Sequence, residues 1–543
     1  MTRAFAAALV ALLLCVPSAA ADDLPMQLPG DATASAVRSD PDTWLVGAVP
    51  GRESAAIARR FHADHGGLGN YKVKRSQARA FAAALRKRHL LVYAQANVLL
   101  KTFGVVDDPL SGPPNDWRAR VASPDLTPPP VTPQSPLIAL VDAAADLTHP
   151  EWTGDPNIAT IPGTPVTNAH GTATASVAAA PQNGIGILGV WPGARALNVP
   201  LATEPGTDGA ITCDASGKAI AQAVKNGAAI INMSYGSPSQ CAAEKVQLFF
   251  AIAQGIIPVA AAGNEFESGN PLEFPASLPH VVTVAATTPD DKSAPFSNAN
   301  AAIDLSAPGV GILAAVPFAL DGDGVQDGYE ALSGTSFSAP MVAAALAWVR
   351  QARPELTPDR VVQAVRLSAR DVEKPGWDSL TGFGVLDVGA ALSVPADKLP
   401  IADPLEPNDN LVWVNGTAFG KPAKAIWSGR GTKRLDALLD KQEDPVDVYR
   451  IVVPPGKTAR IAVIPKFGDP SLEVFSTSAV SINDLDRRVA VSRLLGAKKT
   501  ERVTVRNKGK GKHSYYVAVR PQGNSRYQER EYTLRVSAAS TSR

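Results

Sequence analysis

The stretch LIALVD at residues 137–142 decides the fold of the central part of this chain. Five apolar residues in a row predict a strand that is buried on both faces, and an acid follows it directly. A second apolar run, AAIINM at 228–233, comes after the helical pattern AIAQAVK at 219–225. Such alternation, from residue 137 to about 392, predicts an α/β fold, a parallel sheet with helices on both faces.

The size and charge of the chain limit what it can be. With 543 residues it is too long for one hydrophobic core, so several domains are expected. Its 52 basic and 51 acidic side chains nearly cancel. The global charge therefore predicts neither nucleic acid nor an anionic membrane as a partner.

The N-terminus has the pattern of a secretory signal. Arg3 precedes an apolar run at 4–16, and PSAAA at 17–21 supplies the small residues of a cleavage site. We expect a signal peptide at residues 1–21 and a secreted protein, extracellular or periplasmic. No later stretch approaches the roughly 20 apolar residues of a membrane span, so no membrane partner is expected after signal removal.

Two further regions flank the α/β part. Residues 22–104 predict a small α+β unit, with strands at 44–49 and 71–73 and helices at 53–61 and 81–85. The Pro-rich stretch at 123–133 predicts an extended connector.

After residue 400 the pattern changes to period two. Residues 502–506, 515–519 and 532–536 alternate in and out between Gly- and Pro-bearing turns. We therefore place the α/β domain at 105–396, a linker at 397–410 and an all-β sandwich at 411–543.

Histidine is the scarcest residue of a hydrolytic triad, and His170 is the one that stands out. The segment NAHGT at 168–172 opens an Ala-rich helix, so an imidazole can project from a helix start. His280 precedes a buried strand and His149 precedes a proline, so both are interpreted as structural. The remaining histidines lie in the flanking regions: His62, His65, His89 and His513.

A carboxylate and a nucleophile complete the set. Asp142 follows a buried strand, which is where a parallel sheet delivers an acid to its carboxyl edge. Ser336 lies in LSGTSFSAPMVA at 332–343, a glycine-marked turn that enters an apolar helix. A helix start offers backbone N–H groups and positive potential where an oxyanion would develop.

These segments resemble the signature blocks of the subtilase family of serine peptidases, in the family's order. The blocks are Asp142 with His149-Pro150, then His170-Gly171-Thr172, then AAGN at 261–264, then Gly334-Thr335-Ser336 with Ala339-Pro340. The order Asp, His, Ser differs from that of chymotrypsin and of α/β-hydrolases. An esterase elbow is absent, because Ser338 stands where a second glycine is needed.

The resemblance implies a subtilisin-like fold and a role for each residue. Asp142, His170 and Ser336 are the implied triad, and Asn264 is the implied oxyanion donor. The implied substrate-binding segments pair with a peptide as an added strand, and they comprise Ser234, Tyr235, Gly236, Ala261 and Gly263. The implied substrates are proteins or peptides, and no cofactor is needed for the chemistry.

The flanking regions carry weaker resemblances. Residues 22–104 resemble in layout the inhibitory propeptide of subtilases, which implies a zymogen whose own propeptide acts as an intramolecular inhibitor. Short motifs at 406–409, 447–449 and 468–472 resemble the prepeptidase C-terminal domain of secreted bacterial proteases. A monomer is expected.

The four site residues and two departures from the family motifs also permit a non-enzymatic interpretation. Taken singly, each of the four site residues fits a cap or a turn, and only their shared order and glycine companions favour an active site. Ala143-Ala144 replaces the hydroxyl and glycine that usually follow the aspartate, and Ala173 stands where a second histidine is frequent. A secreted binding or adhesion protein on a degenerate protease scaffold is therefore the alternative. No charged residue of these motifs predicts a side-chain preference.

Cysteines and acidic loops add two structural expectations. Cys213 and Cys241 are the only cysteines left after signal removal, so a disulfide is expected, with two separate buried thiols as the alternative. Asp321, Asp323 and Asp327 lie on a Gly-rich loop that fits either a structural Ca²⁺ site or a solvated turn.

Overall fold

The computed structural model describes residues 39–65, 69–98, 108–112, 116–202, 211–496, 498–522 and 531–539. The predicted signal peptide at 1–21 lies outside the described residues. The chain forms two compact units, residues 1–105 and 106–543. Among the described residues, no helix combines the length and the apolar character that a membrane crossing requires.

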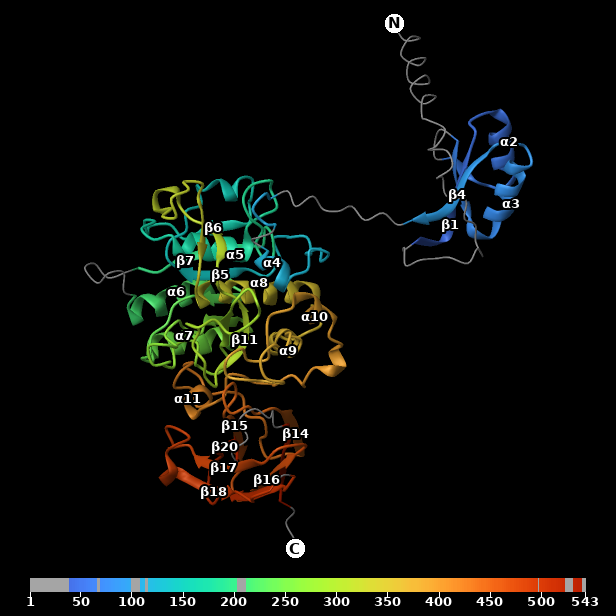
Figure 1. Cartoon of the computed structure of the whole chain (residues 1–543). Coiled ribbons are helices and arrows are strands. Elements are labelled where there is room, and N and C mark those ends of the chain that lie inside the picture. Colours follow the sequence, from blue (N-terminus) through green and yellow to red (C-terminus); the bar gives the residue numbers. More distant parts are fainter. Residues whose placement is uncertain are drawn as a thin grey trace. The chain divides into compact units, whose positions relative to one another are not determined.

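The first unit is a four-stranded antiparallel sheet with two helices on one face (Figure 1). In chain order it contains β1 (Ser39–Ala48), α2 (Arg52–Arg60), β2 (Asp64–His65), β3 (Asn70–Lys74), α3 (Arg75–Arg86) and β4 (Leu91–Val98). The strand order is β2-β3-β1-β4. Val46, Tyr71, Phe81 and Leu85 form its core because period-two strands and an amphipathic helix point their apolar side chains to one layer.

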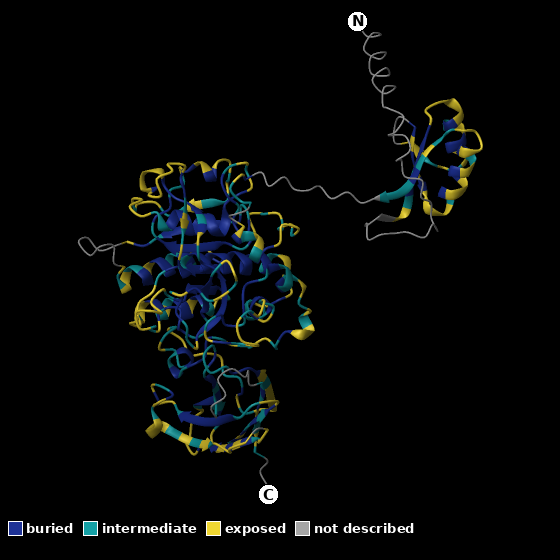
Figure 2. Cartoon of the chain, in the orientation of Figure 1, coloured by how far each residue is buried: buried dark blue, intermediate teal, exposed yellow. Residues whose placement is uncertain are grey.

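The second unit begins with a seven-stranded parallel sheet in the order β11-β10-β9-β8-β5-β7-β6. Its strands are β5 (Ile138–Asp142), β6 (Ile158–Thr160), β7 (Ala196–Pro200), β8 (Ile230–Met233), β9 (Ile257–Ala261), β10 (Val282–Thr287) and β11 (Ile303–Pro308). Every residue of β5, β8 and β9 is buried, as a sheet covered on both faces requires (Figure 2).

Helices cover both faces of this sheet, which confirms the predicted subtilisin-like α/β fold. On one face lie α5 (His170–Ala179) and α8 (Thr335–Ala352), whose Ala-rich surfaces share a large core with β5, β9 and β10. On the other face lie α6 (Cys213–Lys225) and α7 (Ala242–Ile252). The remaining elements of this part are α4 (Trp117–Val121), η2 (Pro150–Trp152), β12 (Ile312–Ala315), η3 (Phe318–Leu320), β13 (Tyr329–Leu332), α9 (Pro358–Leu367), α10 (Val388–Ser393) and η4 (Ala396–Lys398).

The C-terminal part contains two four-stranded antiparallel sheets, as the period-two pattern predicts. One has the order β14-β21-β16-β19 and the other β15-β20-β17-β18. The elements are α11 (Leu411–Val414), β14 (Thr432–Ala437), β15 (Asp447–Val453), β16 (Thr458–Pro465), β17 (Pro470–Ser476), η5 (Leu485–Arg487), β18 (Arg488–Ser492), β19 (Glu501–Arg506), β20 (His513–Pro521) and β21 (Tyr532–Ala538).

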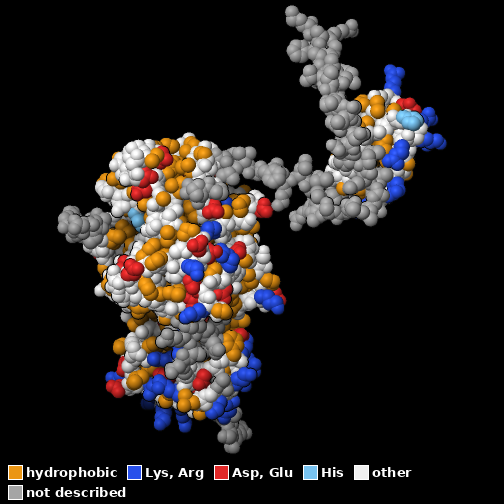
Figure 3. Space-filling model, viewed as in Figure 1, with side chains coloured by type: hydrophobic (Ala, Val, Ile, Leu, Met, Phe, Trp, Pro, Cys, Tyr) orange, Lys and Arg blue, Asp and Glu red, His pale blue; other side chains and the backbone are white. Residues whose placement is uncertain are grey.

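The two sheets enclose one core and carry basic side chains outside. Inward residues such as Ile451, Ile461, Val517 and Leu534 pack together between them. Figure 3 shows Lys and Arg side chains spread over this domain. The exposed ones on its strands include Lys433, Arg434, Arg460, Arg502, Arg506 and Arg535.

Candidate active site

Asp142 is the last residue of the buried strand β5 and lies at the carboxyl edge of the sheet. It is only 3% exposed, so its carboxylate must be satisfied by nearby donors. Oδ1 accepts the backbone N–H of Ala143 at 2.7 Å, and Oδ2 accepts the hydroxyl of Thr174 at 3.1 Å. The carboxylate is therefore held in one orientation from two sides.

His170 is the first residue of α5, and its ring faces this carboxylate. Nδ1 lies 2.6 Å from Oδ1 of Asp142, and the backbone N–H of His170 donates to Oδ1 of Asn168 at 2.7 Å. Gly171 permits the approach, because a Cβ placed there would lie 2.0 Å from the carbonyl oxygen of Ala143. The structure thus brings the predicted acid and the predicted base together.

Asp142 changes the pKa of the His170 imidazole. Burial of the imidazole lowers the pKa of His170, but the charge of Asp142 and the hydrogen bond to it raise the pKa. The net effect is a pKa above the ordinary value for histidine. An imidazole in this setting is a stronger base, and its cation is stabilised by the carboxylate.

Ser336 is the second residue of α8 and follows the extended turn at Gly334. Its hydroxyl donates to the carbonyl oxygen of Ser234 at 3.3 Å. Among the described residues, no hydrogen bond joins Ser336 to His170, although the next side chain, Phe337, lies 5.7 Å from the His170 ring between centroids. Hydrogen bonds of a catalytic set are often formed fully only with substrate bound.

Asn264 lies three residues beyond the end of β9, and α8 fixes its amide. Oδ1 accepts the backbone N–H of Thr335 at 2.9 Å and the hydroxyl of Thr335 at 3.0 Å. Because the oxygen already has two donors, the amide nitrogen remains the group that can donate to a ligand. Among the described residues, that nitrogen has no hydrogen-bond partner, and the side chain is exposed next to Thr335, which precedes Ser336.

The segment after β8 offers an unpaired backbone next to Ser336. The hydroxyl of Ser234 donates to the carbonyl oxygen of Ser336 at 2.8 Å, which fastens the segment to α8. In the described part of the chain, the backbone groups of Tyr235 and Gly236 have no hydrogen-bond partner. The Tyr235 side chain turns away, with its hydroxyl 2.8 Å from Oγ of Ser216. An extended peptide can therefore pair with the backbone here.

The second predicted segment lies opposite. Ala261 ends β9, and Gly263 adopts a φ of 105°, which favours glycine. Its N–H donates to the hydroxyl of Thr335 at 3.2 Å. Both segments thus flank the start of α8.

A model of the subtilase family matches residues 135–384, which include all of these residues. Subtilisin BL of Lederbergia lenta is 33% identical over 257 residues, which cover 47% of this chain and 89% of that relative. The chain belongs to the subtilase family. This subtilase is a serine endopeptidase, and its substrates are proteins or peptides.

Two comparisons concern fervidolysin of Fervidobacterium pennivorans. It is 30% identical over 285 residues, which cover 48% of the subtilase and 41% of fervidolysin. Its crystal structure, described as that of a keratinolytic enzyme related to subtilisin, aligns at a TM-score of 0.48 and 18% identity. That alignment covers 89% of the subtilase and 88% of the fervidolysin chain.

The predicted disulfide is confirmed. The carboxylates of the predicted calcium loop do not converge on one point. Cys213 and Cys241 form a disulfide with a Cα separation of 5.6 Å. Asp321, Asp323 and Asp327 instead accept backbone N–H groups of their own loop, at 2.8, 2.7 and 2.9 Å. In the described part of the chain, their oxygens are not among the groups of three or more that lie within 4.8 Å of one another.

Sequence reasoning missed two residues of this site. Thr174 supplies a hydroxyl to Asp142, and its position four residues after His170 on a helix was the available signal. Glu273 lies between Gly236 and Gly263 and places a charged side chain beside segments whose own motifs predicted no side-chain preference. No pattern in the sequence marks Glu273, because the chain between it and Asn264 folds back only in three dimensions.

Proposed function

We propose that this subtilase hydrolyses peptide bonds through an acyl-enzyme with Asp142, His170 and Ser336 as its triad. The observation that supports the proposal most is the 2.6 Å contact of a buried carboxylate with the imidazole that opens α5. In the reaction, His170 takes the proton of Ser336 as the hydroxyl attacks the scissile carbonyl, and Asp142 stabilises the imidazolium.

Asn264 and the backbone N–H of Ser336 hold the developing oxyanion in this proposal. The two hydrogen bonds from Thr335 to Oδ1 of Asn264 support the assignment, because they aim the amide nitrogen before substrate arrives. Loss of such a donor costs about 3 kcal/mol of transition-state stabilisation, a magnitude known from subtilisin itself. Water then releases the acyl group from Ser336.

The proposal also covers the secretion and maturation of the chain. Residues 1–21 direct secretion, residues 22–104 inhibit the enzyme until they are removed, and the mature enzyme is a monomer. The separate compact fold of the described residues between 39 and 98 supports a removable inhibitor, because a unit with its own core can leave without unfolding the rest. The C-terminal β domain resembles prepeptidase C-terminal domains and follows the peptidase domain.

Covalent labelling with a fluorophosphonate probe tests the catalytic proposal against the degenerate-scaffold alternative. We expect the mature enzyme to be labelled at Ser336 and the Ser336→Ala variant to remain unlabelled. His170→Ala should slow labelling by several orders of magnitude, because the hydroxyl loses its base. A mature enzyme that does not label, yet is folded by circular dichroism, would favour the scaffold alternative.

A further inference from the structure

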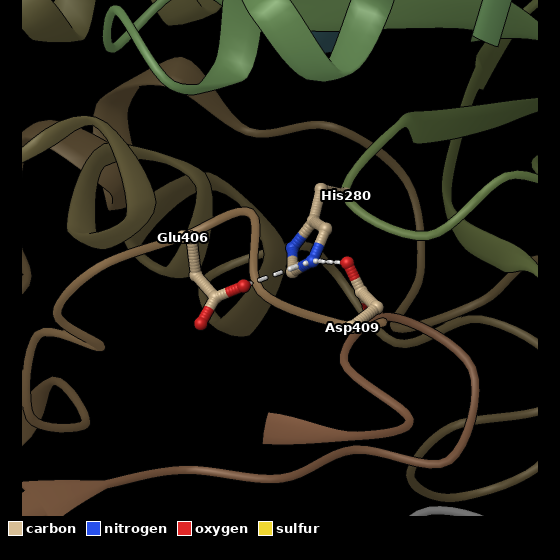
Figure 4. A group of neighbouring side chains, drawn as sticks. All are labelled: His280, Glu406 and Asp409. Carbon is tan, nitrogen blue, oxygen red and sulfur yellow. Dashed lines mark hydrogen bonds and ion pairs between the residues drawn. The ribbon is translucent and has the colours of Figure 1, made fainter. Parts of the chain in front are cut away.

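Five carboxylates gather where the C-terminal β domain meets the peptidase domain. Asp403, Glu406 and Asp409 lie in the segment between the two domains, and Asp444 and Asp447 precede and begin β15. His280, just before β10, reaches this group from the peptidase side (Figure 4).

Four of the acids converge on one point. One oxygen each from Asp403, Glu406, Asp444 and Asp447 lies within 4.8 Å of the others. Nε2 of His280 lies beside the cluster, 3.3 Å from Oε2 of Glu406 and 3.2 Å from Oδ2 of Asp409. Among the described His, Cys, Asp and Glu side chains, those that meet at the convergence point all offer carboxylate oxygens.

Hydrogen bonds do not satisfy this group. Asp409 and Asp444 are each 8% exposed, yet Oδ1 of each has no hydrogen-bond partner. Oδ1 of Asp403 is buried and unpartnered as well. Asp447 differs, since Asn408 and Tyr532 both donate to it. An unpartnered buried carboxylate oxygen is costly, so the oxygens of Asp403 and Asp444 point to a cationic ligand at the convergence point.

The charge balance leads to the same conclusion. In the part of the chain that the structure describes, His280 is the only cationic side chain in an ion pair with these five acids. The single imidazole carries at most one positive charge against five carboxylates, and a divalent cation would offset two more.

We propose that Asp403, Glu406, Asp444 and Asp447 bind one Ca²⁺ that fastens the β domain to the peptidase domain. Calcium prefers carboxylate oxygens and tolerates irregular geometry, which fits an all-oxygen site built from two loops. A softer metal such as Zn²⁺ would favour the nitrogen of His280, but that nitrogen already faces two carboxylates. His280 instead positions Glu406 and Asp409 from the other domain.

The surroundings make this site an interdomain one. A cavity of about 350 Å³ lies between the domains, and its lining includes His280, Asp403, Glu406 and Asp444. The backbone N–H of His280 donates to the carbonyl oxygen of Glu443 at 3.1 Å. If the ion were released, the four carboxylates would repel one another next to the hydrogen bond between His280 and Glu443.

The test uses the full chain with Ser336→Ala, which prevents self-digestion, after removal of metals with EDTA. We expect isothermal titration with CaCl₂ to show a site that saturates at one ion per chain. In calorimetry, Ca²⁺ at about 100 times its Kd should raise the Tm of the β domain by roughly 5 °C. An equal response to ZnCl₂ that disappears in His280→Gln would overturn the assignment to calcium.

Asp444→Asn separates a cation site from a merely structural acid. Because the carboxylate has an unpartnered oxygen, its neutralisation should raise the Tm in EDTA and abolish the rise caused by Ca²⁺. Asp486→Asn, an exposed acid of the same domain, is the matched control and should keep the full response. If Asp444→Asn retains the response, the proposal is wrong; if it fails to fold, Asp403→Asn provides the same comparison.

A second inference rests on an independent observation, the position of Glu273 in the cleft. A Cβ placed on Gly236 would lie 3.0 Å from Oε2 of Glu273, and one on Gly263 would lie 2.8 Å from its Cγ. The residue is 5% exposed. Among the described residues, no hydrogen bond or cation contributes to the surroundings of its carboxylate, which are set by burial and by the charge of Glu265. An unpaired acid therefore lies between the two segments that flank Ser336.

Electrostatics supports a cationic ligand at this acid. Burial raises the pKa of Glu273 to about 7, and the charge of Glu265 contributes. We infer that the cleft accepts a Lys or Arg side chain next to the scissile carbonyl, with Glu273 as its partner. The inference rests on the proposed function, since a peptide paired with residues 234–236 directs that side chain between the segments.

Peptide substrates that differ only in this side chain test the specificity. The mature enzyme should prefer Arg over Leu in kcat/KM, and Glu273→Gln should reduce the ratio by about 10- to 100-fold. Glu267→Gln, an exposed acid of the same loop, should keep the ratio. Equal losses on both substrates would overturn the inference, whereas an enzyme that no fluorophosphonate labels would instead contradict the proposed function.

Discussion

Thr174 replaces a hydroxyl that the chain lacks at the usual position. Subtilases usually carry Thr or Ser after the catalytic aspartate, but here Ala143 offers only its N–H. Thr174, one turn after His170 on α5, donates its hydroxyl to Oδ2 of Asp142 at 3.1 Å. Asp142 therefore receives a hydroxyl from another element, the helix α5.

Removal of the Thr174 hydroxyl should let the Asp142 carboxylate leave its fixed orientation without unfolding the enzyme. We expect Thr174→Val to lower kcat roughly 5- to 10-fold with little change in KM, because one neutral hydrogen bond is lost. Thr174→Ser should retain activity. Adding Ala143→Ser to Thr174→Val should restore part of kcat, since the hydroxyl returns from the other side. If the double variant is no better than Thr174→Val, compensation is contradicted.

The pH profile should report the contact between Asp142 and His170. The base must be neutral to accept a proton, so kcat/KM rises with pH through the pKa of His170, which Asp142 holds above the ordinary value. In Asp142→Asn the midpoint should move to lower pH, and kcat should fall by roughly 10⁴-fold. Initial rates from pH 5 to 10 measure both quantities. An unmoved midpoint would indicate that another group titrates.

Glycine at the start of α5 determines how close the helix comes to β5. A Cβ at position 171 would lie 2.0 Å from the Ala143 carbonyl oxygen and 2.6 Å from its carbon, and backbone cannot yield as a flexible side chain can. The helix and His170 would therefore move away from Asp142.

Gly171→Ala should accordingly reduce both activity and stability. We expect fluorophosphonate labelling to slow at least roughly 100-fold, because an error of about 1 Å in catalytic geometry has that effect. Gly322→Ala is the matched control, since a Cβ there meets nothing within 4 Å. Labelling at the normal rate in Gly171→Ala would show that α5 tolerates the displacement.

The disulfide connects two helices on the same face of the sheet. It joins the first residue of α6 to the residue before α7 across a sequence separation of 28. A loop of this length restricts the unfolded chain, which stabilises the fold by roughly 2–4 kcal/mol.

Replacement of both cysteines should therefore lower the melting temperature. We expect the Cys213→Ser, Cys241→Ser double variant, in the Ser336→Ala background, to melt roughly 5–10 °C lower in calorimetry. A reducing agent should produce the same decrease in the parent protein and none in the double variant. Equal melting temperatures would mean that the bridge contributes nothing.

Maturation is the behaviour that involves the entire chain. If residues 22–104 form a removable inhibitor, the precursor should cut itself near residues 100–110 once Ser336 is functional. Mass measurement after incubation should find this cut in the parent chain and the intact precursor in Ser336→Ala. A cut that occurs in both would point to a contaminating protease.

Much of this molecule could be predicted from local sequence. The run at 137–142 defines a buried strand and its terminal acid, since five apolar residues leave no solvated face, and NAHGT defines a helix that begins with histidine. The glycine at 334 marked the turn that enters α8. Period-two segments likewise predicted β19, β20 and β21. These features depend on neighbours within a few residues, so the linear pattern contains them.

Other features depend on residues far apart in the chain, and no linear pattern contains them. His280 was interpreted as structural because it precedes a buried strand; the acids that face it, Asp409 and Glu406, lie about 130 residues later in the sequence. Glu273 became part of the cleft only when its loop folded back on Gly236 and Gly263. Charge and burial are set by packing in three dimensions, so only the tertiary structure decides the proposed cation site and the position of Glu273 in the cleft.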